Sequence, residues 1–214
     1  DDFERETGLS PDDTVITLCA KGKASDDFAA ELDAAGYEDV TVVADGMRGW
    51  SAVYDRTDVP LPDAPDAAPP LDVVQIQRRA KGCLGYLVVG GREPGEADHV
   101  VASGSASDSD GSDRVAVAID VSRHGDEWVE AAAERDASIA AVLDTHVHAD
   151  HLSGGRALAD RLDVPYYLPA AAAARDVAHA FEPIGRNETL DVGGVDLKAL
   201  ATPGHTDDGA SYLV

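Results

Sequence analysis

Four side chains that can bind a metal ion crowd into one short stretch of the chain. The sequence THVHADH at residues 145–151 follows residues 138–143, whose apolar side chains are typical of a buried strand. Imidazoles and a carboxylate that converge at the end of a strand are suitable ligands for zinc, iron or manganese. We therefore predict a metal site, with His146, His148, Asp150 and His151 as candidate ligands.

A further histidine follows another predicted strand. His205 lies in the sequence TPGHT at residues 202–206, directly after the strand-like residues 197–201. If the two strands are neighbours, His205 can complete a three-histidine face with His146 and His148. An open coordination position on that face would make the site catalytic. Isolated histidines are interpreted as surface residues; these are His99, His124 and His179.

Cys19 is the candidate nucleophile. It follows the strand-like residues 14–18 and precedes a predicted helix with Ser25 as its N-cap. Backbone N–H groups at a helix start stabilise a thiolate and lower the pKa of the cysteine. This pattern favours a thiolate that accepts sulfur and carries it as a persulfide, and the alternative is an inert, half-buried cysteine. Cys83 stands in an apolar strand and is interpreted as a packing residue.

The overall charge excludes several classes of partner. The 214 residues include 41 acidic and 17 basic side chains, a net charge of −24. Such a surface repels nucleic acid and anionic membranes, and no apolar run reaches the roughly 18 residues of a membrane span. Because the acids are spread along the chain, they indicate solvation at high salt, as in a halophilic cytoplasmic protein, rather than an acidic partner-binding face. Two cysteines make no disulfide framework, which also favours a reducing cytoplasm.

A proline-rich stretch predicts two domains. Residues 58–72 form the expected linker. Residues 1–57 alternate strand, cysteine loop, helix and strand, which is half of a small α/β domain and too short to bury a full core. Because this half cannot bury a full core, we expect that upstream strands are missing; the first residue, Asp1 rather than Met, favours a fragment or a processed chain. Residues 73–214 form the second α/β region, with a surface loop predicted near residues 90–113 and a helix starting at Pro169.

The metal-type motifs carry a family resemblance. HVHADH at residues 146–151 resembles the HxHxDH signature of the metallo-β-lactamase superfamily, and the TPGHT turn resembles its second histidine motif. The resemblance covers residues 73–214 and implies a C-terminally incomplete αββα sandwich with metal between the sheets. It implies a first metal position lined by His146, His148 and His205, and a second faced by Asp150 and His151.

Within this superfamily, THVHADH and the sequence GCLGYL at residues 82–87 most resemble the persulfide dioxygenases. That family holds one Fe(II) with two histidines, matching His146 and His205, and with an aspartate downstream of the TPGHT turn. The 214 residues end before the position of that aspartate, so we expect the chain to be an incomplete enzyme. The glyoxalase II enzymes, which are hydroxyacylglutathione hydrolases, share both motifs and imply the alternative of a zinc thioesterase with one or two Zn²⁺ ions. Asp150 is the predicted catalytic residue of this domain.

The cysteine region resembles the rhodaneses. CAKGKAS at residues 19–25 resembles the rhodanese active-site loop, and DGMRGW at residues 45–50 resembles a turn downstream of it. The likeness covers residues 1–57, the C-terminal half of that domain, and implies that Cys19 is catalytic. Many rhodaneses have arginine at the places of Ala20 and Ala24, so the substrate preference stays open. The predicted substrate-binding residues are Lys21, Gly22, Lys23 and Ser25.

Together the resemblances imply an enzyme of sulfur metabolism. A rhodanese-like sulfurtransferase module would supply or receive sulfur, and an iron-dependent module would oxidise a low-molecular-weight thiol persulfide to sulfite with O2. The expected partner is a small-molecule persulfide or, in the hydrolase alternative, a thioester; a homodimer is the expected oligomer. A third alternative is a sulfur carrier or sensor whose metal domain is idle.

Overall fold

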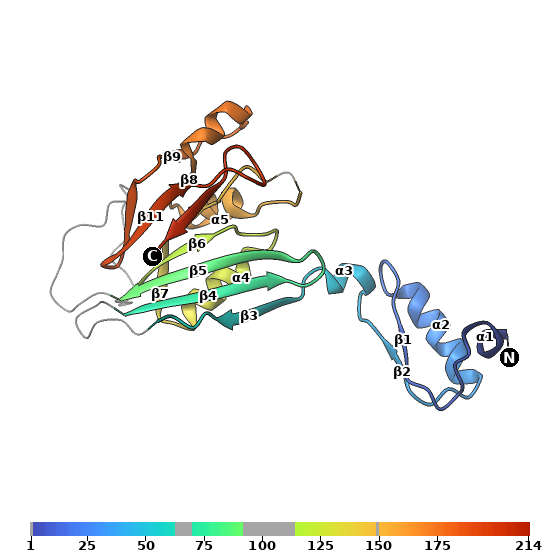
Figure 1. Cartoon of the computed structure of the whole chain (residues 1–214). Coiled ribbons are helices and arrows are strands. Elements are labelled where there is room, and N and C mark those ends of the chain that lie inside the picture. Colours follow the sequence, from blue (N-terminus) through green and yellow to red (C-terminus); the bar gives the residue numbers. More distant parts are fainter. Residues whose placement is uncertain (1, 63–69, 92–113, 149) are drawn as a thin grey trace. The chain divides into compact units, whose positions relative to one another are not determined.

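The computed structural model describes residues 2–62, 70–91, 114–148 and 150–214 (Figure 1). The contacts divide the chain into two compact units. The first comprises residues 1–53 and 78–82, and the second comprises residues 54–77 and 83–214. Most of the predicted loop at 90–113, and residues 63–69 of the predicted linker, lie outside the described residues.

The first unit is a small α/β structure. Its elements are α1 (Asp2–Thr7), β1 (Val15–Thr17), α2 (Lys23–Ala34), β2 (Val40–Val42) and α3 (Gly46–Trp50). The two strands pair in parallel, so the chain must cross between them, and α2 makes that crossover. A small core of Val15, Leu32 and Tyr37 lies between the helix and the strands.

The predicted helix cap in this unit was wrong. Helix α2 begins at Lys23, so Ser25 lies inside its first turn and is buried instead of capping it. Gly22 occupies the N-cap position with a φ of 90°, a conformation that favours glycine. The helix starts three residues earlier than predicted because Gly22 turns the chain directly from the cysteine loop into α2.

The second unit is built on a seven-stranded sheet in the order β3-β4-β5-β6-β7-β8-β9. The strands are β3 (Tyr54–Asp58), β4 (Leu71–Arg78), β5 (Cys83–Gly91), β6 (Arg114–Ile119), β7 (Ala137–Leu143), β8 (Tyr166–Pro169) and β9 (Glu182–Ile184). Strands β5 and β6 are antiparallel, whereas β6, β7, β8 and β9 run parallel. The carboxyl ends of β6 and β7 therefore meet at one edge.

A smaller antiparallel sheet and three helices complete this unit. The sheet contains β10 (Thr189–Val192), β11 (Val195–Ala201) and β12 (Ala210–Leu213). The helices are α4 (Asp126–Ala133), α5 (Gly155–Leu162) and the 3₁₀ helix η1 (Ala170–Arg175). Within the described residues, no helix is both long and apolar enough to cross a bilayer.

Two hydrophobic clusters show how the layers pack. Trp128 of α4 and Leu158 of α5 pack with strand residues on one face of the large sheet. Leu143 on the other face packs with Val192 and Leu197 of the small sheet. The layers thus run helix, large sheet, small sheet, which confirms the predicted α/β class and the sandwich of two sheets.

Three short strands were not predicted. Strands β3 and β9 lie at the two edges of the large sheet, and β3 is largely polar because an edge strand buries little of its surface. Strand β3 pairs within the sheet of the second unit, although the predicted boundary at residue 57 assigns most of it to the first region. Strand β10 was the third. The helix predicted from Pro169 forms as the 3₁₀ helix η1.

Candidate metal centre and cysteine loop

The parallel strands β6 and β7 place Asp120 close to the histidine segment, the sequence THVHADH that begins at Thr145. Strand β7 ends at Leu143, directly before the segment, and its partner opposite is Ile119 of β6. Asp120, the first residue after β6, therefore lies beside Thr145, whose backbone N–H donates to Asp120 Oδ1 at 2.7 Å. The candidate metal site thus lies at the carboxyl ends of β6 and β7.

The histidine rings gather above this edge. The ring centroids of His146 and His148 are 4.2 Å apart, as are those of His148 and His151. His205 arrives from the turn after β11, in the small sheet, and its ring centroid lies 5.1 Å from that of His146. The strands that precede the two motifs, β7 and β11, belong to different sheets, so each sheet supplies part of the histidine cluster.

Three overlapping groups of side chains could hold a metal ion. Within each group the potential ligand atoms lie within 4.8 Å of one another. The groups are Asp120, His146 and His148; His146, Asp150 and His205; and His148, Asp150 and His151. All five predicted ligands occur in them, although His146, His148 and His205 do not form a single group. Asp120 is the addition that sequence reasoning missed.

The buried ring nitrogens indicate that the donor set fits a metal ion. His146 Nδ1 contacts Thr145 Oγ1 at 2.9 Å, and His148 Nε2 contacts Asp120 Oδ1 at 3.1 Å. The opposite nitrogens, Nε2 of His146 and Nδ1 of His148, are buried without a hydrogen-bond partner, as is Nε2 of His151. Buried polar atoms are rarely left unpaired. Imidazole nitrogens and carboxylates suit iron or zinc, so this chemistry fits either ion.

Asp120 orients the first two histidines. Its carboxylate accepts from the backbone N–H and hydroxyl of Thr145 and contacts His148 Nε2. Asp120 has a φ of 49°, which is uncommon for a residue with a side chain and places the carboxylate at the turn out of β6. The sequence signal was an apolar strand ending in an acid, but only the parallel pairing of β6 with β7 reveals its partner.

The pKa values of His148 and His146 shift in opposite directions. Burial disfavours the charged form of His148, but hydrogen bonds and charges of Asp120 and Asp144 outweigh it and raise its pKa to about 10. Burial and the nearby charge of His148 lower the pKa of His146. The pKa of Asp150 is lowered, since bonds from its own backbone N–H and from His151 outweigh partial burial. A metal ion at His148 must therefore displace a proton.

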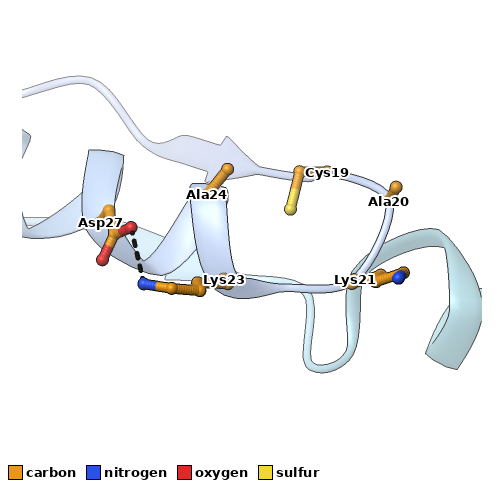
Figure 2. A pocket seen from close by; sticks show the side chains of 6 residues that line it. All are labelled: Cys19, Ala20, Lys21, Lys23, Ala24 and Asp27. Atoms are coloured by element: carbon orange, nitrogen blue, oxygen red, sulfur yellow. Dashed lines mark hydrogen bonds and ion pairs between the residues drawn. The ribbon is translucent and has the colours of Figure 1, made fainter.

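The cysteine loop forms the second candidate site. Cys19 and Lys21 line a shallow pocket of about 440 Å³ with Ala20, Lys23, Ala24 and Asp27. Figure 2 shows Lys23 extending to Asp27 rather than toward Cys19, and the two charged groups are 3.3 Å apart. Lys23 is thus paired with an acid, whereas no ion pair of Lys21 is found among the residues that the structure describes.

Hydrogen bonds favour the thiolate form of Cys19. Ser25 Oγ lies 3.2 Å from Cys19 Sγ and 2.8 Å from the carbonyl oxygen of Gly22. The Ser25 hydroxyl, then the backbone N–H groups of Lys21 and Ser25, lower the pKa of Cys19 to about 7. Ser25, predicted as a cap and a substrate-binding residue, is therefore a thiolate partner here.

The DGMRGW turn at residues 45–50 contacts the backbone of the cysteine loop. Met47 donates its backbone N–H to the carbonyl oxygen of Cys19 at 2.7 Å. Gly46 has a φ of 57°, and a Cβ there would lie 2.0 Å from the same oxygen. Only glycine permits this approach. The DGMRGW stretch thus supports the loop of Cys19.

The chain thus has a first α/β unit that contains the cysteine loop, and a second unit of two sheets that contains the candidate metal centre. Residues 1–53 match the family model of the rhodanese-like domain, and residues 117–214 match that of the metallo-beta-lactamase superfamily. The chain therefore contains a rhodanese-like domain and a metallo-β-lactamase superfamily domain.

Curated relatives match only part of the chain, which spans less than a third of the relative described next. Over 79 residues the chain is 38% identical to the hydroxyacylglutathione hydrolase of Thiobacillus denitrificans, spanning 37% of this chain but only 30% of that relative. A metallo-beta-lactamase from Staphylococcus aureus has a similar fold, with a TM-score of 0.51 at 23% identity over 67% of this chain and 38% of its own. The structure of ETHE1 from Myxococcus xanthus is 28% identical, with a TM-score of 0.48, over 65% and 52% of the two chains.

Proposed function

We propose that this protein oxidises a low-molecular-weight thiol persulfide to sulfite at a mononuclear iron site and moves sulfur through Cys19. The observation that carries the proposal is a pairing on one chain. A cysteine with a pKa near 7 belongs to a rhodanese-like domain, and a two-histidine, one-carboxylate donor group belongs to the metallo-β-lactamase domain. The first favours sulfur transfer, and the second favours iron and O2.

In the proposed iron donor set, Asp150 takes the place of the downstream aspartate that the family resemblance implies. His146, Asp150 and His205 supply two imidazoles and one carboxylate within 4.8 Å. Fe(II) in such a set supplies O2 activation and a coordination position for sulfur. Thr145 orients His146 by contact with its Nδ1, and Asp120 holds Thr145 in turn. Asp150, with its side chain 57% exposed, is the carboxylate that an incoming substrate can reach.

The overall reaction balances without another oxidant. One thiol persulfide, one O2 and one water give one thiol, one sulfite and two protons. The outer sulfur loses four electrons and O2 gains four, while the bond between the two sulfur atoms breaks. Of the three hydrogen atoms of the persulfide group and the water, one stays on the thiol and two are released as protons.

Cys19 would carry sulfur in a separate step. Its thiolate attacks the outer sulfur of a persulfide or thiosulfate, so that a new S–S bond forms as the old one breaks and a thiol or sulfite leaves. Ser25 stabilises the thiolate before attack. Lys21 lines the pocket and is suited to the anionic substrate, and Gly22 turns the chain from the loop into α2.

Thioester hydrolysis is the second candidate. It is supported by the local likeness to hydroxyacylglutathione hydrolases and by the additional group of His148, Asp150 and His151. That group could hold a second ion, and Asp150 belongs to this group as well as to the group of His146 and His205. Zinc would then supply a hydroxide nucleophile at neutral pH.

Metal content and substrate turnover separate the two proposals. The chain is prepared with Fe(II) or with Zn²⁺ and given glutathione persulfide or S-lactoylglutathione. One iron per chain, with O2 uptake and sulfite release from the persulfide, supports the oxygenase. Two zinc ions with thioester cleavage and no O2 uptake would overturn it in favour of the hydrolase. His205→Ala should abolish either activity, whereas the exposed His179→Ala is the matched control.

Sulfur transfer has its own test. With thiosulfate and a thiol as the sulfur source, Cys19→Ala should lower sulfite yield at least tenfold, because no carrier forms the persulfide. With preformed glutathione persulfide the same variant should stay near the wild-type rate. Equal yields from wild type and Cys19→Ala with both sulfur sources would contradict the coupling of the two domains.

A further inference from the structure

A buried carboxylate next to the metal centre belongs to none of the three donor groups. Asp208 follows His205 by three residues, and its side chain is only 2% exposed. An ionised carboxylate in such a place requires strong partners, because burial of an unpaired charge is costly. Its partners therefore show what the residue does.

The first partner is the backbone of the histidine segment. Asp208 Oδ2 accepts a hydrogen bond from the backbone N–H of Val147 at 2.8 Å. Val147 is the residue between His146 and His148, and its side chain packs against the main core. The turn that carries His205 is thus joined to the segment that carries the other two histidines.

The second partner comes from a third segment. Nε of Arg175, the last residue of η1, lies 3.0 Å from Asp208 Oδ1. Because Oδ1 has no aligned hydrogen bond, this contact is an ion pair. The Arg175 side chain is 37% exposed, so it brings a partly hydrated positive charge to a buried negative one. Burial would raise the pKa of Asp208, but the Val147 N–H and the Arg175 charge help to lower it.

We propose that Asp208 and Arg175 form a positioning pair that fixes His205 relative to His146 and His148. One backbone bond, from the N–H of Ala210 to the carbonyl oxygen of Thr145 at 2.8 Å, also joins the two segments. Along the chain Ala210 is five residues from His205 and Asp208 is three, so the side chain of Asp208 is the nearer tie. The inference rests on the proposed metal site but on neither proposed reaction.

The test measures metal binding and ligand geometry. The metal-free chain is titrated with Co(II), and both the dissociation constant and the visible ligand-field spectrum are recorded. Asp208→Ala should weaken binding about tenfold to 100-fold, the usual effect of removing a group that orients ligands, and should shift the spectrum. Arg161→Gln is the matched control, because Arg161 forms an exposed ion pair with Asp126 and should leave both readouts unchanged.

A charge-neutral pair provides a rescue. In Asp208→Asn alone, the amide N–H₂ would face the guanidinium of Arg175, and binding should weaken. In Asp208→Asn combined with Arg175→Gln, the asparagine oxygen can still accept from Val147, and its amide can donate to the new glutamine. Cobalt binding should then return to within about threefold of the wild type, a recovery that general loss of stability would not produce.

The outcomes are distinct. Wild-type Co(II) affinity and spectrum in Asp208→Ala would overturn the positioning role while leaving the metal site intact. If Asp208→Ala does not fold, Arg175→Gln decides, and an unchanged affinity and spectrum in it would equally overturn the role. A wild-type chain that binds no Co(II) would refute the metal site itself.

Discussion

Asp120 Oδ1 lies 3.1 Å from Nε2 of His148, and this contact leaves Nδ1 of His148 as the nitrogen available to a metal ion. His146 has the opposite arrangement, because Thr145 contacts its Nδ1 and leaves Nε2. Two histidines separated by one residue thus leave different ring nitrogens unpaired. Asp120 holds one directly and the other through Thr145.

Removing Asp120 should therefore weaken metal binding although it need not be a ligand. We expect Asp120→Ala to raise the dissociation constant for Zn²⁺ about tenfold to 100-fold, because both histidines lose their orientation. Competition with a chromophoric chelator measures this. Asp160→Asn removes an exposed carboxylate paired with Arg156 and serves as the control. Equal affinity in Asp120→Ala and in the control would refute the orienting role.

The reactivity of Cys19 should depend on pH with a midpoint near 7. Because its pKa is lowered from 9.0 to about 7, the thiolate predominates above pH 7 and is protonated below it. The rate of alkylation by iodoacetamide should rise through that midpoint, measured in a Cys83→Ala background. Ser25→Ala removes the first cause of the shift, so its midpoint should move upward, toward 9.0. A midpoint that is the same with and without Ser25 would contradict this account.

The turn at Gly46 should tolerate no side chain. In Gly46→Ala a Cβ would lie 2.0 Å from the carbonyl oxygen of Cys19, so the backbone must shift. We expect a loss of roughly 2 to 4 kcal/mol in the free energy of unfolding of the first unit, measured by urea denaturation. Gly8→Ala is matched, because Gly8 also has a positive φ but open space around it, and it should cost about 1 kcal/mol. Equal losses in both variants would mean that the contact with Cys19 is unimportant.

Salt should stabilise this protein. A net charge of −24 repels itself in the folded state, and raising KCl from 0.1 to 1 M shortens the screening length from about 10 to about 3 Å. The midpoint of thermal unfolding, followed by circular dichroism, should rise by about 5 °C or more over this range. The same concentrations of a neutral osmolyte provide the control. A midpoint independent of KCl would contradict the halophilic interpretation of the composition.

Much of the fold could be predicted because its signals are local. The apolar runs that became β5, β6 and β7 were recognised from composition, and their bounds shifted only slightly. The edge strands β3 and β9 were not, because strands that bury little surface carry little pattern. Ser25 was misplaced because its hydroxyl serves Cys19 and Gly22, and a cap and a loop contact look alike in sequence.

By itself, the sequence determined the chemistry: which imidazoles, carboxylates and thiol this chain can offer, and which two motifs and one loop carry them. Only the tertiary structure decided which of them meet. His205 reaches His146 from a second sheet, Asp120 reaches His148 through the parallel pairing of β6 with β7, and Asp208 reaches Val147 across 61 positions. Spacing along the chain specifies what one strand or turn presents, whereas these contacts arise when separate segments pack around a shared core.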